Sequence, residues 1–367
     1  MPAGVFSVEQ VERARRYHRP LYVALLLDMT LGLAVLSAAA FTGAGDELYG
    51  AVEGLPWWGR ALAFPALVLG VSTLVRLPLS WWRGHLRERR WGFSTQSARG
   101  WLYDRLKAFA VAVVLTSAAV LGLVALARWL PGAWPLAAAP AAAVAVALFG
   151  FAAPVLVEPL FNRFVRLQDE ELSASLRSLA RRAGVPVRDV LVADASRRTR
   201  KVNAYVSGLG ATRRVVLFDT LVAAGDPRQI RLVVAHELGH RRARHVAKST
   251  ALAMGAATAT VLVVWATVSD PADPRNAPLV LLLAALLQLA ALPIASAVSR
   301  RWEREADRVS LELTKDLEAF EAAHRELATA NLSDLDPPRP VYAVLFTHPT
   351  PPERIAAGRA WAHATVG

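Results

Sequence analysis

Three histidines and a glutamate lie close together in the segment AHELGHRRARH, residues 235–245. His236 and His240 are four residues apart, so on a helix both imidazoles project from one face, one turn apart. A zinc ion requires this convergence, because its nitrogen ligands must approach it to about 2.0–2.1 Å. Glu237 lies about 100° around the helix, where it can act as the general base on a zinc-bound water. The spacing therefore predicts a catalytic zinc site with two ligands on this helix.

The alternative for this segment is an amphipathic helix end with solvated histidines. The preceding run IRLVVA (residues 230–235) is apolar, so the pair would extend from a buried helix, and burying titratable groups without a function is costly. His245 is nine residues beyond His236, which on a continuous helix is roughly 180° away. We expect His245 to be interfacial or solvated, not a third ligand.

A third ligand is expected in SRRWEREADRVSLEL, residues 299–313, on a helix that continues out of an apolar tract. Glu303 stands 63 positions after His240, but the chain between them reads as a transmembrane hairpin whose two ends can lie side by side. Glu303 would complete a His₂Glu site with an open fourth position, and Asp307, one turn on, can accept a hydrogen bond from a ligating imidazole. The alternative is a charged helix face with i, i+4 ion pairs. Glu305 is a rival ligand that points about 200° from Glu303.

The composition is too apolar for an ordinary soluble enzyme, with 54% hydrophobic residues and a positive mean hydropathy. The absence of cysteine excludes disulfides, cysteine-ligated zinc and a cysteine nucleophile. The net charge of +12 clusters beside apolar tracts, which indicates membrane topology and no nucleic-acid partner. Six tracts are long enough to span a bilayer: roughly 21–41, 61–82, 107–127, 134–157, 249–269 and 278–299. The first tract lacks a signal-peptide cleavage site, so we expect it to be a membrane helix. The fourth contains Pro140 and Pro154, and its alternative is a buried re-entrant helix.

The charges flanking these tracts predict the orientation of the chain. Arginines gather before the first span and between spans two and three, whereas acidic residues prevail between spans one and two and between spans five and six. The positive-inside rule then places both termini in the cytoplasm. We expect four segments: a membrane domain with four spans (1–157), a first catalytic part (158–248), a transmembrane hairpin (249–299) and a second catalytic part (300–367).

The polar segments predict a small α+β unit. DEELSASLRSLARRAG (169–184) has helical periodicity and ends at glycine, and DVLVADA (189–195) is a short β-rich run. NAYVSGLGATRRVVLFDT (203–220) resembles two strands joined by a glycine-containing turn. The helix that bears HELGH should begin with Asp226 as N-cap and Pro227 in its first turn.

Taken together, these segments resemble the type I CAAX prenyl endopeptidases, a family of integral-membrane zinc metalloproteases, and more distantly the bacterial heat-shock membrane metalloproteases. The resemblance covers most of the chain and depends on the order and spacing of several segments: 89–107, 158–184, 202–222, 235–245, WEREAD (302–307) and HPTPPERI (348–355). It implies a mainly α-helical membrane protein with about six transmembrane helices and a cytoplasmic, zincin-like (gluzincin) α+β catalytic domain.

The resemblance also implies roles for individual residues. His236, His240 and Glu303 match the zinc ligands of the family, and Glu237 matches its catalytic base. Three further residues match positions near the substrate: Asn203 beside the strand with which substrate pairs, and His348 and Arg354 at the scissile carbonyl and its oxyanion. Simpler interpretations are a turn residue for Asn203 and an anchor for the C-terminal tail for Arg354.

The sequence departs from the eukaryotic family pattern in two respects: Val202 stands where serine is usual, and six spans are expected instead of seven. The composition is typical of prokaryotic proteins, so we expect no strict requirement for a prenyl lipid. The predicted function is zinc-dependent endopeptidase activity on membrane-associated or C-terminal, CAAX-like peptides at the cytoplasmic face of the bilayer. The alternatives are a quality-control protease without prenyl specificity, a catalytically silent scaffold or sensor, and a transporter, for which Asp28 and Arg76 are the candidate ionisable residues.

Overall fold

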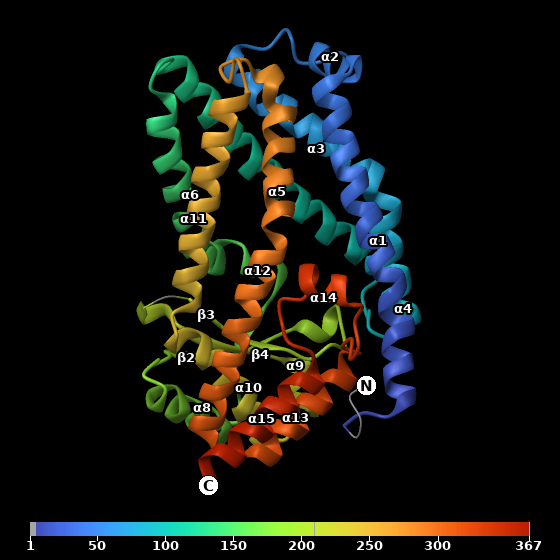
Figure 1. Cartoon of the computed structure of the whole chain (residues 1–367), viewed down its shortest axis with the longest axis vertical. Coiled ribbons are helices and arrows are strands. Elements are labelled where there is room, and N and C mark those ends of the chain that lie inside the picture. The colour runs from blue at the N-terminus through green and yellow to red at the C-terminus, as the bar shows by residue number, and fades with distance from the viewer. Residues whose placement is uncertain (1–4, 209, 367) are drawn as a thin grey trace.

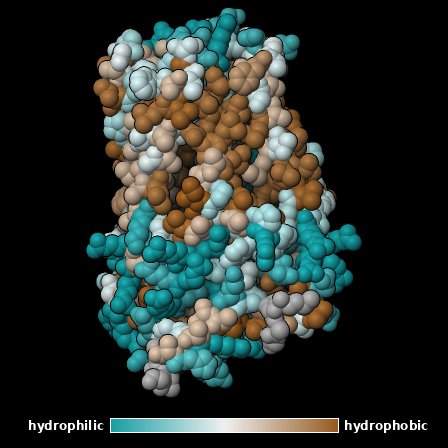
Figure 2. Space-filling view, in the orientation of Figure 1, coloured by the Kyte–Doolittle hydropathy of each residue, from teal (hydrophilic) through white to brown (hydrophobic). Residues whose placement is uncertain are grey.

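The computed structural model describes residues 5–208 and 210–366 and has an apolar helical part and a polar part that contains a small sheet. Figure 1 shows the long helices above the sheet, with the two termini at the end where the sheet lies. In Figure 2 a broad hydrophobic band covers the helical part, and the region around the sheet is hydrophilic. The molecule therefore has the surface of a membrane protein with one large polar domain.

Six helices of the described chain are long and apolar enough to cross a membrane, which confirms the six spans expected from the sequence. The α3 helix continues through a π-helical segment, Trp82–Leu86, into α4 (Arg87–Arg90). The fourth tract is one continuous helix through Pro140, so it is not broken into re-entrant pieces. The six are α1 (Val8–Phe41), α3 (Trp57–Trp81), α5 (Ala98–Trp129), α6 (Trp134–Leu156), α11 (His245–Thr267) and α12 (Ala277–Thr314).

Several of these helices extend well beyond their apolar tracts, because polar helix formers and caps continue the helix outside the bilayer. The α1 helix begins at Val8, where the Ser7 hydroxyl accepts a hydrogen bond from the Gln10 backbone and the Gln10 side chain accepts one from the Ser7 backbone. The α12 helix runs on to Thr314. Both therefore project from the membrane region into the polar part of the molecule.

The spanning helices form a ring in which α1, α3, α5, α6, α11 and α12 each pack on the next, and α12 returns to α1. Asp28 of α1 and Arg76 of α3 bind one another in this ring, with Arg76 Nε 3.0 Å from Asp28 Oδ1. Because a charge inside a bilayer is costly unless it is paired, this pairing accounts for both residues without a transport pathway.

The polar part is built on a four-stranded mixed sheet with the order β1-β2-β4-β3. The strands are β1 (Phe164–Arg166), β2 (Asp189–Ala193), β3 (Ala204–Ser207) and β4 (Arg214–Phe218); β2 and β4 are parallel and the other pairs antiparallel. The expected β2 run and β3–β4 hairpin are thus confirmed. Strand β3 lies at one edge of the sheet.

Helices cover this sheet and form its core. The α8 helix (Glu170–Arg182) starts at the N-cap Asp169 and ends before Gly184 in the left-handed region, as the sequence predicts. The α10 helix (Pro227–Arg242) has Asp226 as its N-cap, also as predicted. Buried aliphatic side chains of α8, β4 and α10 pack together in one hydrophobic core: Leu176, Leu179, Val215, Leu217, Ile230, Val234 and Leu238. The remaining helices are α2 (Gly43–Gly50), α7 (Glu158–Phe161), α9 (Asp219–Ala224), α13 (Leu317–Ala330), α14 (Arg339–Leu345) and α15 (Pro351–Val366).

The backbones of α10 and α12 approach each other closely in the polar part. Gly239 of α10 is buried, and a Cβ at this position would lie 3.0 Å from both the Cα and the carbonyl oxygen of Ala306. Only glycine leaves room for two helix backbones at this distance. The glycine of the HELGH segment therefore brings α10 against the part of α12 that contains Glu303 and Asp307.

Candidate metal centre

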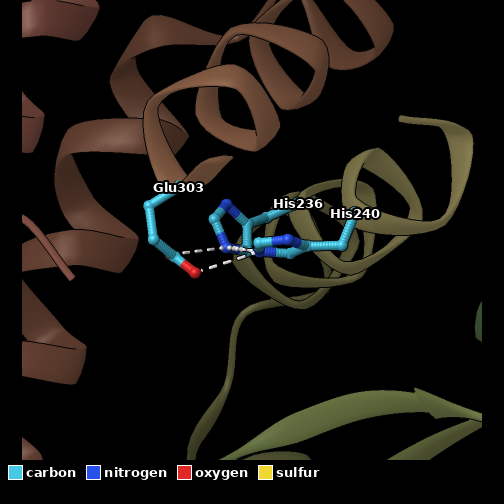
Figure 3. Close-up of side chains that lie close together, drawn as sticks. All are labelled: His236, His240 and Glu303. Carbon is cyan, nitrogen blue, oxygen red and sulfur yellow. Dashed lines mark hydrogen bonds and ion pairs between the residues drawn. The ribbon is translucent and has the colours of Figure 1, made fainter. Parts of the chain in front are cut away.

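His236, His240 and Glu303 meet at the contact between α10 and α12. The two histidines project from one face of α10, and Figure 3 shows Glu303 of α12 pointing toward them. Glu303 Oε2 lies 3.2 Å from His236 Nε2, and Oε1 lies 3.1 Å from His240 Nε2. The two Nε2 atoms are 3.1 Å apart. Among the described residues, these three are the group of His, Cys, Asp and Glu side chains close enough to share a metal ion.

This arrangement fits a bound zinc ion. Ligand atoms that share one tetrahedral zinc at 2.0–2.1 Å are about 3.3 Å apart, close to the separations between these three side chains. Glu303 Oε2 is buried and receives no hydrogen bond, although His236 Nε2 lies near it. Burial and the nearby Arg354 charge oppose a positive charge on His236, yet the adjacent Asp307 and Glu303 carboxylates outweigh them and raise the pKa of His236 to about 9. The site therefore favours a cation between its two imidazoles and the carboxylate.

Asp307 lies behind His236, on the side away from Glu303. Its Oδ1 is 2.8 Å from His236 Nδ1, so it can accept the proton of that nitrogen and leave Nε2 free as a ligand. Arg354 of α15 donates to the same carboxylate through Nε, 2.8 Å from Oδ2, and through Nη2. The Asp307 and Arg354 side chains are 7% and 16% exposed, so this is a buried ion pair.

Glu237 faces the cleft beside the cluster and forms part of its lining. Burial raises the pKa of its carboxyl above the usual value, and the nearby Glu303 charge adds to this shift while the two histidines oppose it. A carboxylate that holds a proton more tightly than usual is suited to accept one from water near neutral pH.

The cleft in front of the cluster has a volume of about 490 Å³ and brings together segments from the whole chain. Its lining residues include His18 of α1, Leu327 of α13 and Phe346, which follows α14. One of the six long apolar helices thus contributes a side chain to the cleft.

The three residues expected near substrate all line this cleft. His348 is 60% exposed, with Nε2 3.3 Å from Glu303 Oε1. Asn203 precedes β3, and its Oδ1 accepts a hydrogen bond from the Ala204 backbone at 2.9 Å. Arg354 uses Nε and Nη2 on Asp307, and because a guanidinium has five N–H groups, Nη1 remains able to donate to another oxygen.

Strand β3 presents its outer edge to α10. The carbonyl of Asn203 accepts from Phe218 of β4 at 3.0 Å, so in the antiparallel alternation Ala204 and Val206 turn their backbone groups away from β4. Arg241 of α10 donates to the Val206 carbonyl. Arg241 therefore binds the outer edge of the sheet at Val206.

The expectation that His245 is interfacial or solvated is wrong, whereas its expected absence from the ligand group agrees with the structure. The α10 helix ends at Arg242, and Arg244 has φ 57° and ψ 31°, in the left-handed region. Helix periodicity therefore does not continue to residue 245, and the chain turns back toward the site. His245 is buried, 3% exposed, with Nδ1 3.0 Å from His240 Nδ1. It contacts a predicted ligand from behind and is not itself in the three-residue group.

Two further residues lie near the cluster, and the sequence indicated only one of them. Glu305, considered as a rival ligand, accepts from His245 Nε2 at 3.1 Å and is not in the ligand group. His324 of α13 is buried beside Asp307, with Nε2 3.8 Å from Asp307 Oδ1, and lines the cleft. No local pattern marks His324, because only the packing of α13 against α10 brings it to the site.

Comparisons with known proteins agree with this architecture. Residues 166–362 match the model of peptidase family M48, and residues 2–163 match the model described as CAAX prenyl protease N-terminal, five membrane helices. That second stretch contains four helices of spanning length among the described residues.

Individual relatives are similar over much of the chain. An uncharacterized metalloprotease YhfN of Bacillus subtilis is 32% identical over 315 residues, which cover 81% of this chain and 72% of that protein. CAAX prenyl protease 1 of Saccharomyces cerevisiae is 34% identical over 188 residues, 51% of this chain and 42% of that one. The crystal structure of S. mikatae Ste24p superposes with a TM-score of 0.85 at 25% identity and covers 97% of this chain and 90% of that chain.

Proposed function

The chain is a membrane metalloprotease of peptidase family M48, and from this premise we propose that it hydrolyses peptide bonds with one zinc ion held by His236, His240 and Glu303. One observation carries the proposal: α10 and α12 bring these three side chains together, and His236 and Glu237 line an adjacent cleft large enough for an extended peptide. Asp307 orients His236 so that its Nε2 faces the ion.

Three residues that line the cleft have a proposed role in the reaction. When bound, zinc supplies a positive charge that acidifies water and polarises a carbonyl group. Glu237 takes the proton of the attacking water and later gives it to the leaving amine. His348 and the free Nη1 of Arg354 donate hydrogen bonds to the oxyanion, and a donor of this kind contributes about 3–4 kcal/mol in other enzymes.

The proposed substrate-binding element is the outer edge of β3 at Ala204. An extended peptide would add to this edge at the Ala204 carbonyl, and at the Ala204 N–H once the Asn203 side chain, which accepts that hydrogen in the structure, turns aside. Backbone pairing is tolerant of side chains, so we propose a substrate class of membrane-associated or C-terminal, CAAX-like peptides with no strict need for a prenyl group. The position of His18 from α1 in the cleft supports entry from the membrane surface.

We propose that the cleft lies on the cytoplasmic side. The arginine-rich connections lie at the same end of the spanning helices as the sheet, and the opposite end has α2 and the connection between α11 and α12. Asp46 and Glu47 belong to α2, and Asp270 and Asp273 belong to that connection. Reporter fusions at Gly45 and Asn276 should then give external signals. A cytoplasmic signal at either position would contradict the proposed orientation.

Cleavage of a generic quenched peptide by the purified full chain in detergent tests the function. Wild type should cleave it, and Glu237→Ala should be slower by at least about 100-fold, since a general base contributes about 10²–10⁴-fold. Both proteins should contain one zinc per chain. Undiminished cleavage by the variant refutes the role of Glu237, whereas wild-type protein with zinc but without cleavage supports a silent scaffold.

A second assay addresses the lipid. Farnesylated and unmodified forms of one peptide should be cleaved with kcat/KM values within about tenfold of each other, because about tenfold corresponds to only 1.4 kcal/mol of differential binding. Cleavage restricted to the farnesylated form would show that the prenyl group is a required recognition element.

A further inference from the structure

A chain of contacts runs from the ligand His240 away from the cleft. His240 Nδ1 lies 3.0 Å from His245 Nδ1, and His245 Nε2 lies 3.1 Å from Glu305 Oε2. The His245 ring stacks on Trp302, with ring centroids 5.0 Å apart and an angle of 13° between the planes. The His245 ring is therefore held on one face and contacted at both nitrogens.

The hydrogens in this chain can be assigned from the ligand atom. His240 must leave Nε2 unprotonated to bind a cation, so its neutral ring carries the proton on Nδ1. Only one hydrogen fits between two nitrogens 3.0 Å apart, so His245 Nδ1 is the acceptor. Neutral His245 then carries its proton on Nε2 and donates it to the Glu305 carboxylate. Every donor meets an acceptor in this one arrangement.

The local fold explains how a residue nine positions after His236 reaches this place. The left-handed Arg244 ends the register of α10 and starts α11 at His245. Trp302 and Glu305 lie on α12, the other arm of the transmembrane hairpin. His245 is thus the first residue of one arm, and its ring packs against the part of the other arm that borders the metal cluster.

We propose that His245 is a positioning residue that accepts the Nδ1 proton of His240 and so fixes the tautomer and orientation of this ligand. This inference rests on the proposed zinc site. His236 receives the same support from Asp307 on the other side of the cluster, so each ligand imidazole has its own acceptor. The support for His240 comes from the membrane hairpin, whereas that for His236 comes through the Asp307–Arg354 pair.

Three substitutions at this position separate hydrogen bonding from packing. His245→Asn retains an oxygen near the place of Nδ1 and can still accept from His240. His245→Gln extends its amide toward Glu305 and loses the acceptor at the Nδ1 place. His245→Phe retains a ring that can stack on Trp302 and loses both polar contacts.

The readouts are the zinc dissociation constant of the full chain in detergent, by competition with a chromophoric chelator, and the visible spectrum of the Co²⁺-loaded protein. Loss of the acceptor behind a metal-bound histidine typically costs 10–100-fold in metal affinity. We expect about this loss for the Phe and Gln variants, with a shifted Co²⁺ spectrum, and an affinity within about threefold of wild type for the Asn variant. Thermal unfolding of the zinc-free protein shows whether the Phe variant folds. If it does not, the comparison of zinc affinity between the Asn and Gln variants tests the inference.

Two results overturn the inference while the proposed function stands: wild-type affinity in the Gln and Phe variants, or an Asn variant as weak as these. Wild-type protein that binds no zinc would overturn the zinc site itself, and the role of His245 with it.

Discussion

Replacing Gly239 with alanine tests how closely α10 and α12 must approach for the site to form. The new Cβ would lie 3.0 Å from the Cα and the carbonyl oxygen of Ala306 and 3.3 Å from its Cβ. Comfortable contacts between carbon atoms lie at about 3.5–4.0 Å, so the two backbones must separate by about 0.5 Å. Both atoms at 3.0 Å belong to the backbone, so no change of rotamer can relieve the contact.

Two free energies oppose each other in this variant. Alanine stabilises a helix interior by about 0.5–1 kcal/mol relative to glycine, and overpacking typically costs about 1–3 kcal/mol. The free energy of unfolding should therefore fall by about 0–2.5 kcal/mol.

Zinc affinity and catalysis should be reduced more clearly than the free energy of unfolding. His236 and His240 lie on α10 and Glu303 on α12, and ligand distances must stay within about 0.2 Å of their ideal values. A helix separation of about 0.5 Å exceeds this tolerance. We expect Gly239→Ala to lose at least about tenfold in zinc affinity and in kcat/KM, since a misplacement of about 1 Å can cost about 100-fold in rate.

The assays are chelator competition for zinc, peptide cleavage and thermal unfolding, all on the full chain in detergent. Gly255→Ala on α11 is the matched control, because its Cβ would meet no atom within 4 Å, and it should bind zinc as wild type does. Wild-type zinc affinity in Gly239→Ala would refute the argument that this helix contact sets the geometry of the site.

Three further predictions concern the surroundings of the cluster. Asp307→Asn leaves the buried Arg354 charge without its partner and should lower the free energy of unfolding by about 3–5 kcal/mol; an unchanged denaturation midpoint would contradict this. Burial, together with the Arg354 charge, lowers the pKa of His324 in the folded protein to about 3, whereas a histidine in the unfolded chain has a pKa of about 6.5. Between these two pH values the unfolded chain binds a proton at this ring and the folded protein does not. Stability should then fall by about 1 kcal/mol between pH 6.5 and 5.5, and His324→Gln should lose this part of the pH dependence; an identical pH profile would exclude His324 as its source. Removal of metal by a chelator should abolish cleavage and lower the unfolding temperature, with both restored by zinc, because a ligand at about 1,000 times its Kd stabilises by about 4.1 kcal/mol; cleavage that survives chelation would contradict a metal-dependent reaction.

The sequence predicted those features of the molecule that depend on local periodicity and hydropathy. Six apolar tracts gave six spanning helices, and the four-residue spacing of His236 and His240 put both rings on one face of α10. Glu303 could be placed near them because a hairpin of two spans returns the chain to its starting side. The continuation of α12 past the bilayer then brought Glu303 and Asp307 to the correct face.

What the sequence did not predict depends on a break in periodicity or on packing between distant helices. We predicted the direction of His245 for an unbroken helix, but Arg244 adopts a left-handed conformation that is uncommon for arginine and that no local sequence pattern indicates. His324 reaches Asp307 only because α13 packs on α10. The partners of Arg241 and Glu305 likewise belong to other elements, so charge patterning alone could not identify them.

Anomalous scattering at the zinc absorption edge, from crystals of the full chain, tests the central claim most directly. The account predicts one strong peak per chain, within bonding distance of His236 Nε2, His240 Nε2 and a carboxylate oxygen of Glu303, with His245 behind His240. A peak coordinated by a different set of side chains, or zinc-loaded protein with no peak among these three residues, would contradict it.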